Sequence, residues 1–194
     1  MSFRPMSTFP NLLFIKFTLI KRIYMKKTLL TLTALFASAI AFAQGQSTIQ
    51  SWDFNSGIPT GWTQTTSATD GGFQAGSASS ISSQYFTITD PGSNIVGTND
   101  DDCNCDKSDE YLITDTINLS NYSALHATFK SFYFGATYNG STEAAEFLYT
   151  TNGGTSWTSL ANITPGADWT SQWIDISAAC GNSNVQFAFN YQDA

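Results

Sequence analysis

Alternation of hydrophobic and polar residues is the strongest pattern along this chain, and it predicts β-strands. The segment VQFAFNY places Val185, Phe187, Phe189 and Tyr191 on one face, with polar or small residues between them. Because successive side chains of a strand point to opposite faces, this pattern is typical of an antiparallel strand with one buried face. After residue 43 we find no apolar period of 3.6 residues long enough to predict a helix.

The same alternation recurs upstream. In ALHATFKSFYF (124–134) the apolar residues change phase near Ser131, which predicts a bulge or bend there. The segment EAAEFLYTTNGGTSWTSL (143–160) predicts two strands joined by the Asn152-Gly153-Gly154 turn. Further short strands are predicted at SWDF, SQYFTIT, EYLITD and WIDIS. We therefore expect an all-β domain, an antiparallel β-sandwich of jelly-roll type, over residues 44–194.

The first 43 residues carry a targeting signal. The stretch MKKTLLTLTALFASAIAFAQGQ has a basic start, a short apolar core and the cleavage motif Ala41-Phe42-Ala43, so we interpret residues 25–43 as a secretory signal peptide. Its apolar core is too short to span a membrane, and no transmembrane segment is expected after cleavage. Residues 1–24 precede a complete signal, and we interpret them as a mis-assigned extension, with translation starting at Met25.

Cleavage after Ala43 makes the remaining chain strongly acidic. It leaves two cations, Lys107 and Lys130, against fifteen carboxylates, a net charge of −13. Nucleic acid and anionic membrane surfaces are excluded as partners, because both require a basic face. A divalent cation is compatible with this charge.

Four motifs follow one another along the chain: WDFNSGIPTGWT (52–63), SDEYLITDTINLSNYSALHATFKSFYF (108–134), EAAEFLYTTNGGTSW (143–157) and WTSQWIDISAACGNSNVQFAFNY (169–191). In this order they resemble the MAM-like jelly-roll modules called cleaved-adhesin or choice-of-anchor domains, which occur in exported surface proteins of Gram-negative bacteria. The resemblance covers most of residues 50–193 and implies a calcium-stabilised β-sandwich. The sequence departs from the pattern at Asp115, where the family usually has Pro, and in lacking a final strand with an Asp-Asp pair. We therefore expect a fragment, truncated at its C-terminal end.

The stretch NDDDCNCDKSDE (99–110) concentrates six carboxylates. It does not fit an EF-hand, since the best register places Lys107 where Gly is required and Ile113 where Glu is required. Neighbouring carboxylates repel each other, and a bound calcium ion would relieve that repulsion. A solvated acidic loop without an ion is the alternative. Together with the resemblance, these considerations give the expected calcium ligands Asp53, Asp100, Asp101, Asp109 and Glu143, with Glu110 as a further candidate.

Three cysteines, Cys103, Cys105 and Cys180, remain after cleavage. The C-x-C spacing does not match thioredoxin-like motifs, and zinc would require His126, on the polar face of its strand, as the fourth ligand. Because a Cys103–Cys105 bridge would be strained, we expect a disulfide from one of this pair to Cys180, clamping the loop to the sandwich.

Catalytic motifs are absent from the sequence. Its sole histidine is His126, and neither G-x-S-x-G nor H-E-x-x-H occurs, so we expect no enzyme activity. Trp62, in the Gly/Pro-rich segment GIPTGWT, is the candidate ligand-binding residue, an exposed aromatic on which a sugar could stack.

We therefore expect a secreted or cell-surface, non-catalytic module for adhesion or ligand binding, whose partner is an extracellular protein or glycan. The alternative is an accessory domain of a secreted peptidase or glycoside hydrolase, including a carbohydrate-binding module, with its catalytic part beyond residue 194.

Overall fold

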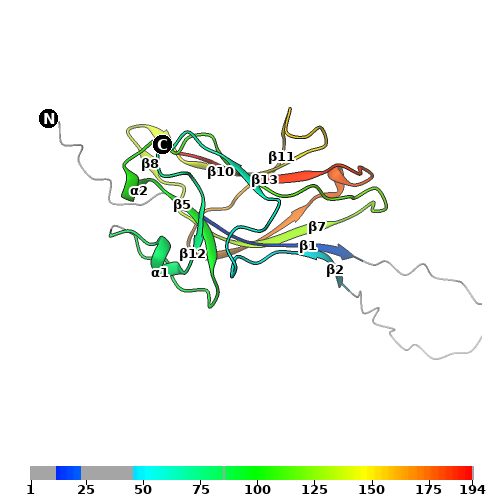
Figure 1. Cartoon of the computed structure of the whole chain (residues 1–194), viewed down its shortest axis with the longest axis horizontal. Coiled ribbons are helices and arrows are strands. Elements are labelled where there is room, and N and C mark those ends of the chain that lie inside the picture. Colours follow the sequence, from blue (N-terminus) through cyan, green and yellow to red (C-terminus); the bar gives the residue numbers. More distant parts are fainter. Residues whose placement is uncertain (1–11, 23–45, 85, 194) are drawn as a thin grey trace, which may run out of the picture.

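Two antiparallel β-sheets pack face to face in the computed structural model, which describes residues 12–22, 46–84 and 86–193 (Figure 1). The predicted all-β class and the antiparallel sandwich are confirmed. Each sheet has an apolar face, and the two faces are buried against each other because only this arrangement removes both from water.

The first sheet has the order β12–β7–β1–β5–β4, and β2 also pairs with β1. All of these pairings are antiparallel. The bounds of its strands are β1 Leu12–Arg22, β2 Gln46–Ser51, β4 Gln74–Gly76, β5 Ile95–Asn99, β7 His126–Tyr133 and β12 Gly166–Asp175.

The second sheet has the order β11–β10–β13–β6–β3, again antiparallel throughout. Its bounds are β3 Thr63–Thr65, β6 Glu110–Ile113, β10 Ala144–Thr150, β11 Thr158–Asn162 and β13 Gln186–Gln192. The hairpin predicted over 143–160 is confirmed as the β10–β11 pair. The strand predicted from VQFAFNY is confirmed as β13, at the centre of the sheet, with Phe187, Phe189 and Tyr191 fully buried. The prediction that only one face is buried is wrong, because Ala188 and Asn190 on the other face are buried as well.

The remaining elements are short. They are a hairpin of β8 Thr137–Tyr138 and β9 Ser141–Thr142, the helices α1 Ala78–Ile81 and α2 Asp100–Cys103, and the 3-10 turn η1 Ser177–Ala179. No helix among the described residues has the length and apolar character needed to cross a membrane.

Strand β1 lies in the middle of the first sheet, between β7 on one side and β5 and β2 on the other (Figure 1). Its Phe17 and Leu19 are fully buried. The Phe17 ring lies within 5.1–6.5 Å, between centroids, of the rings of Trp52, Trp62, Phe129, Phe147, Phe187 and Phe189.

Residues 12–22 belong to the segment 1–24 that we interpret as an extension before the translation start. That interpretation concerns translation and stays a prediction. The signal peptide predicted at 25–43 lies within residues 23–45, outside the described residues.

Two local predictions have different outcomes. The irregularity expected near Ser131 occurs on the partner strand, where the register of β12 shifts between Gly166 and Thr170 opposite Ser131. The strand predicted from SQYFTIT (83–89) is wrong for its described residues. There the Phe86 and Ile88 amides donate to serine hydroxyls rather than to a neighbouring strand, and serine side chains often compete with sheet pairing in this way.

Candidate functional site

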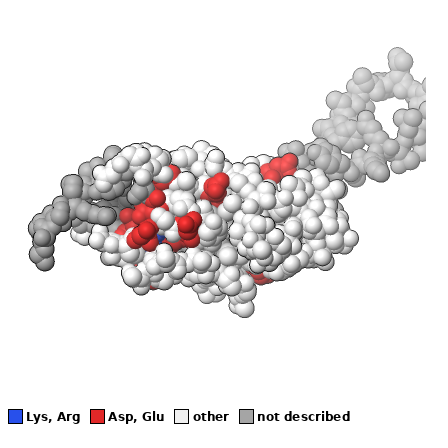
Figure 2. Space-filling view, turned by 90° about the horizontal axis from the view of Figure 1, so that it is seen from above, with Lys and Arg blue, Asp and Glu red and all other residues white. Residues whose placement is uncertain are grey.

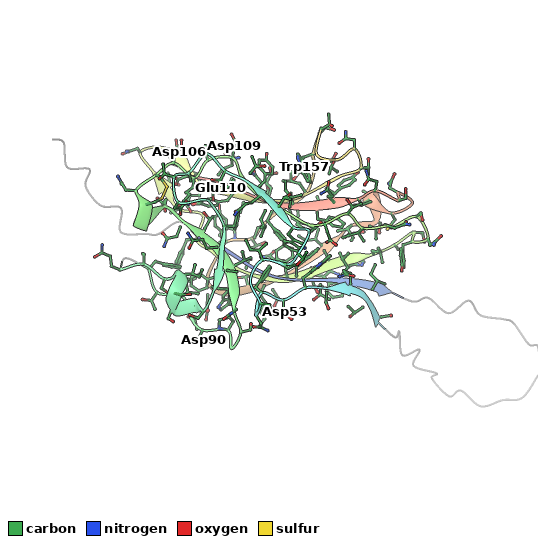
Figure 3. All side chains as sticks on the ribbon, viewed as in Figure 1. Asp53, Asp90, Asp106, Asp109, Glu110 and Trp157 are labelled. Atoms are coloured by element: carbon green, nitrogen blue, oxygen red, sulfur yellow. A yellow bond between two sulfur atoms is a disulfide. The ribbon has the colours of Figure 1, made fainter. Side chains whose placement is uncertain are left out.

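The acidic loop 99–110 connects β5 to β6 at one end of the sandwich and contains α2. The described C-terminal residues reach the same end (Figure 1). Figure 2 shows Asp and Glu side chains gathered into a patch on one face, with only a small spot of Lys or Arg at its centre. Asp106, Asp109 and Glu110 lie together there (Figure 3). The acidic character found in the sequence is therefore concentrated at one end of the molecule.

A buried lysine lies inside this loop. The Lys107 side chain is fully buried, and its Nζ lies 2.5 Å from Asp70 Oδ1 and 3.6 Å from Glu110 Oε1. A buried ammonium group is stable only when carboxylates or other acceptors surround it, because desolvation of the charge is costly. Lys107 therefore neutralises part of the acidic loop from within.

Glu110, the first residue of β6, is fully buried and its carboxylate is bound by protein groups on both oxygens. Thr66 Oγ1 donates to Oε1 at 2.6 Å, and Thr98 Oγ1 donates to Oε2. This carboxylate therefore ties β5, β6 and the segment after β3 together, which is a structural role. A polar recess with a volume of about 280 Å³ opens beside this cluster, lined by Asp70, Gln74, Ser80, Thr98, Asn99 and Cys103, among others.

A second group of acids acts electrostatically on the buried phenol of Tyr191, near the end of β13. Burial raises the pKa of Tyr191 well above its usual value, and Glu143, Asp193 and Asp100 raise it further. The pKa of the buried Tyr133 phenol is also raised, chiefly by burial and further by Glu143. The structure thus brings Asp100 and Glu143, two of the expected ligands, to one end together with Asp193.

Glu143 is almost completely buried and holds the β8–β9 hairpin in place. Its backbone N–H donates to the Ala136 carbonyl at 2.9 Å, and its Oε2 accepts from the Ala136 N–H at 3.2 Å. An anion buried beside two phenols is an environment that a positive ion would stabilise.

Asp109 lies at the same end and contacts the strand that carries Tyr191. Its N–H donates to Gln192 Oε1 at 3.2 Å, and its Oδ1 accepts from Gln192 Nε2 at 2.7 Å. Asp109 has a positive φ of 58°, a conformation that Asp tolerates better than most residues. Three of the five expected ligands therefore lie at this end.

The other two expected ligands are placed differently. Asp53 is exposed, closes a local turn by accepting the Asn55 N–H at 3.0 Å, and lies well away from Asp109 (Figure 3). The Asp101 side chain lies outside the described part of the structure, although its backbone belongs to α2. The structure does not bring Asp53 into the acidic patch.

The disulfide differs from the one expected. Cys103 is joined to Cys105 across 5.1 Å between their Cα atoms, and Cys180 is a free thiol, so the expected bridge to Cys180 is wrong. Asn104, between the paired cysteines, has a positive φ of 48°, which turns the backbone so that the side chains meet.

Distance explains why Cys180 is not a partner. The loop enters β6 where Glu110 pairs with Tyr191, whereas Cys180 precedes Gly181, which bonds to Leu119 at the other end of the paired segments. Nine residues separate Glu110 from Leu119, which corresponds to about 30 Å of extended chain.

One further group of described residues brings potential metal-ligand atoms close together. Ligand atoms of Asp70, Cys103 and Cys105 lie within 4.8 Å of one another. The two sulfurs are consumed by the disulfide, and Asp70 binds Lys107, so this group lacks the thiolates that a soft metal requires.

Trp62 is not the exposed platform expected from its Gly/Pro-rich segment. Its ring is only 7% exposed, because a turn in which the Trp62 N–H bonds to the Pro59 carbonyl directs it inward. It packs edge-on against Trp52 and Phe54. The prediction of Trp62 as a ligand-binding residue is therefore corrected, since a buried ring offers no face to a sugar.

The exposed tryptophan lies elsewhere. Trp173 on β12 is 46% exposed, and its ring centroid lies 5.2 Å from that of His126 on the neighbouring strand β7. Trp157 instead packs on Tyr111, with 6.2 Å between centroids, on the hairpin side of the molecule (Figure 3).

Sequence reasoning missed Lys107, Asp193 and Trp173. Lys107 could have been noticed as the single cation among six acids, a position where burial between carboxylates is a reasonable expectation. Asp193 follows the clearest strand of the chain, so its place at the end of β13 is a direct consequence of that strand. Trp173 alternates with Ile174 and Ile176 in the predicted strand WIDIS, so the same period of two could have placed its ring on the exposed face.

Comparisons with protein-family models, with curated proteins and with solved structures found no match to this chain.

Proposed function

We propose that this chain is an exported, non-catalytic β-sandwich module that binds an extracellular protein or glycan, and that calcium stabilises the end of the sandwich around Tyr191. We also propose that it is a module of the cleaved-adhesin or choice-of-anchor type, which its sequence motifs resemble. The main support for the proposal is the convergence of Asp100, Glu143 and Asp193 on one buried phenol.

The donor chemistry fits calcium. Carboxylate oxygens are the ligands that this hard cation prefers, and the flexible geometry of calcium accommodates side chains contributed by separate loops. Asp100 comes from α2, Glu143 from the β9–β10 connection and Asp193 from the end of β13. These three carboxylates do not form a group within 4.8 Å in the described residues, so an ion shared by them would draw the side chains together or hold one through water.

Two different cations would then balance the acidic end. Lys107 neutralises Asp70 and Glu110. Residues 46–193 contain only one other Lys or Arg, Lys130, which is exposed on β7. Calcium would neutralise the acids that Lys107 does not contact.

Thermal unfolding of the whole chain tests the calcium part of the proposal. We expect millimolar calcium to raise Tm relative to EGTA by about 5 °C or more, because a ligand that binds only the folded state stabilises it. Glu143→Gln should abolish the increase. Asp90→Asn, an acid in an exposed turn away from the patch (Figure 3), is the matched control and should retain it. An equal Tm with and without calcium would contradict the proposal.

Export is tested separately. Expression in a Gram-negative host followed by intact-mass measurement of the extracellular or surface fraction should give a chain beginning at Gln44. A chain that stays inside the cell and retains residues 25–43 would contradict export.

Carbohydrate binding is a second candidate, favoured by the exposure of Trp173. An exposed indole beside an imidazole offers a flat apolar face with a hydrogen-bonding group at its edge, which suits a sugar ring. We expect any glycan binding on an array to be lost in Trp173→Ala and retained in Trp157→Ala. Glycan binding that survives Trp173→Ala would exclude this surface.

A further inference from the structure

The disulfide loop brings sulfur and oxygen atoms that could bind a metal to one point. One such atom from each of Asp70, Cys103 and Cys105 lies within 4.8 Å of the other two. Asp70 comes from the segment before β4, whereas Cys103 ends α2 and Cys105 follows shortly after it. The sulfurs are joined to each other here, so this group can bind a metal only in its reduced form.

The Asp70 carboxylate is already held in place by the protein. Its Oδ1 accepts the Gly72 N–H at 3.1 Å and lies 2.5 Å from the Nζ of the fully buried Lys107. Both contacts are made by Oδ1, so Oδ2 can bind an ion without loss of either. A ligand whose orientation is fixed in this way loses little freedom when the ion binds.

Solvent reaches this group of residues. Asp70 and Cys103 both line the polar recess of about 280 Å³ that opens beside the loop. The Asp70 side chain is 23% exposed, and both cysteines are half-buried. Because thiol–disulfide exchange requires access to a sulfur, a dissolved thiol can attack the bridge, and an ion can enter by the same recess.

The charges of the reduced group match a divalent cation. Two thiolates and the Asp70 carboxylate carry three negative charges, and the Lys107 ammonium group offsets one of them. Zinc, which accepts both thiolate and carboxylate ligands, would cancel the remaining two. Calcium would not, because it binds hard oxygen donors rather than thiolates. Three protein ligands with a fourth position left open is also a usual arrangement for zinc.

We propose that Asp70, Cys103 and Cys105 form a redox-gated zinc site, closed while the cysteines are joined and open after their reduction. A dithiol reductant supplies two electrons and two protons, so the Sγ–Sγ bond breaks, both cysteines become thiols, and the dithiol closes to its own disulfide. Zinc then displaces the two protons to solvent as it binds the thiolates. Oxidation by a disulfide rejoins Cys103 to Cys105, leaves the oxidant as two thiolates and releases the zinc.

The loop can make this change locally. Thiolates on one tetrahedral zinc lie about 3.8 Å apart, because each zinc–sulfur bond is about 2.3 Å long. Rotation of one cysteine side chain provides that separation once the bridge opens, while the Cα atoms stay 5.1 Å apart. The site uses none of Asp100, Glu143 and Asp193, so it is independent of the proposed calcium site.

Zinc titration of the whole chain before and after reduction tests the proposal. The chain is reduced with dithiothreitol, freed of reductant by anaerobic gel filtration, and titrated with Zn²⁺ against a chromophoric chelator in millimolar calcium. We expect one zinc ion per reduced chain, a near-native far-ultraviolet spectrum, and binding weaker by about 100-fold or more in the oxidised chain. Co²⁺ in place of zinc should give thiolate-to-cobalt charge-transfer absorption, which carboxylate ligands alone do not produce. Equal zinc binding by the two forms, or none by the reduced chain, would overturn the proposal.

Matched variants identify the ligands. Cys105→Ser should weaken zinc binding by about 100-fold or more, whereas Cys180→Ser, which removes the thiol outside the group, should change it by less than about 3-fold. Asp70→Asn should weaken binding by about 10-fold or more, and Asp90→Asn is its control. The comparison of reduced with oxidised chain needs no substitution, so the proposal stays testable if a variant does not fold. Full zinc binding in Cys105→Ser or Asp70→Asn, or its loss in Cys180→Ser, would contradict this ligand set.

Discussion

Lys107 and Asp70 form an ion pair whose nitrogen–oxygen distance is 2.5 Å, although they are 37 positions apart in the sequence and the Lys107 side chain is fully buried. This pair joins the acidic loop to the segment before β4. Lys107 Nζ also lies 3.6 Å from Glu110 Oε1, so this cation offsets part of the repulsion among the six acids of the loop.

Replacing Lys107 should therefore destabilise the protein strongly. Lys107→Met leaves the buried Glu110 carboxylate and Asp70 without their cation, and removal of one partner of a buried pair typically costs about 3–5 kcal/mol. Urea unfolding measures the loss in the free energy of unfolding. Lys130→Met, on the exposed face of β7, is the control and should change it by less than about 0.5 kcal/mol. Equal effects of the two substitutions would show that the ion pair contributes nothing.

The cysteine pairing predicts a specific alkylation pattern. In the non-reduced protein only Cys180 should react with iodoacetamide, since Cys103 and Cys105 are joined. Reaction at neutral pH should be slow, because burial, assisted by the nearby Asp175, raises the pKa of the Cys180 thiol and the thiolate is the reactive form. Peptide mass spectrometry after alkylation identifies the modified residue. Label on Cys103 or Cys105 without prior reduction would contradict this pairing.

Truncation of Trp62 should destabilise the fold much more than truncation of Trp173. Trp62→Ala removes a ring that packs on Trp52 and Phe54, and should lower the free energy of unfolding by about 3–5 kcal/mol. Trp173→Ala affects a ring that is 46% exposed and should cost about 1 kcal/mol or less. Denaturation curves of the two variants check this. A larger loss for Trp173→Ala would mean that the burial assigned to the two rings is reversed.

Acid should weaken one turn at the end of β12. The Ser177 hydroxyl and backbone N–H bind the Asp175 carboxylate and hold its pKa below the usual value of 3.8. A carboxyl group whose pKa is depressed in the folded state stabilises the fold above the unfolded-state pKa, and this contribution disappears as pH falls through the folded-state pKa.

The corresponding measurement is Tm as a function of pH between about 2 and 6. Asp175→Asn should lower Tm near neutral pH and make the decrease below about pH 4 less steep. Ser177→Ala, which removes the hydroxyl, should have a smaller effect in the same direction. A decrease below pH 4 that is unchanged in Asp175→Asn would assign the acid sensitivity to other groups.

Local sequence patterns predicted only some of the strands. Alternation identified β13 and the β10–β11 hairpin, because side-chain periodicity alone determines which face of a strand is buried. The same pattern failed at SQYFTIT, where serine hydroxyls bind backbone amides that a strand would use for pairing.

Long-range contacts were beyond sequence reasoning. Trp62 is in a segment whose Gly and Pro residues suggest a surface loop, yet the turn at Pro59 directs its ring into the core. The ion pair of Lys107 depends on Asp70, which no local pattern connects with the acidic loop. The gathering of Asp100, Glu143 and Asp193 likewise depends on how three separate connections meet at one end of the sandwich.

Isothermal titration calorimetry with calcium tests the central proposal most directly. Calcium added to the whole chain, after removal of metal with EGTA and dialysis, should give saturable heat for one ion per chain. The heat should disappear in Glu143→Gln and in Asp193→Asn, and persist in Asp90→Asn. Absence of saturable heat at millimolar calcium, or binding unchanged in Glu143→Gln and Asp193→Asn, would contradict a calcium site at the end of β13.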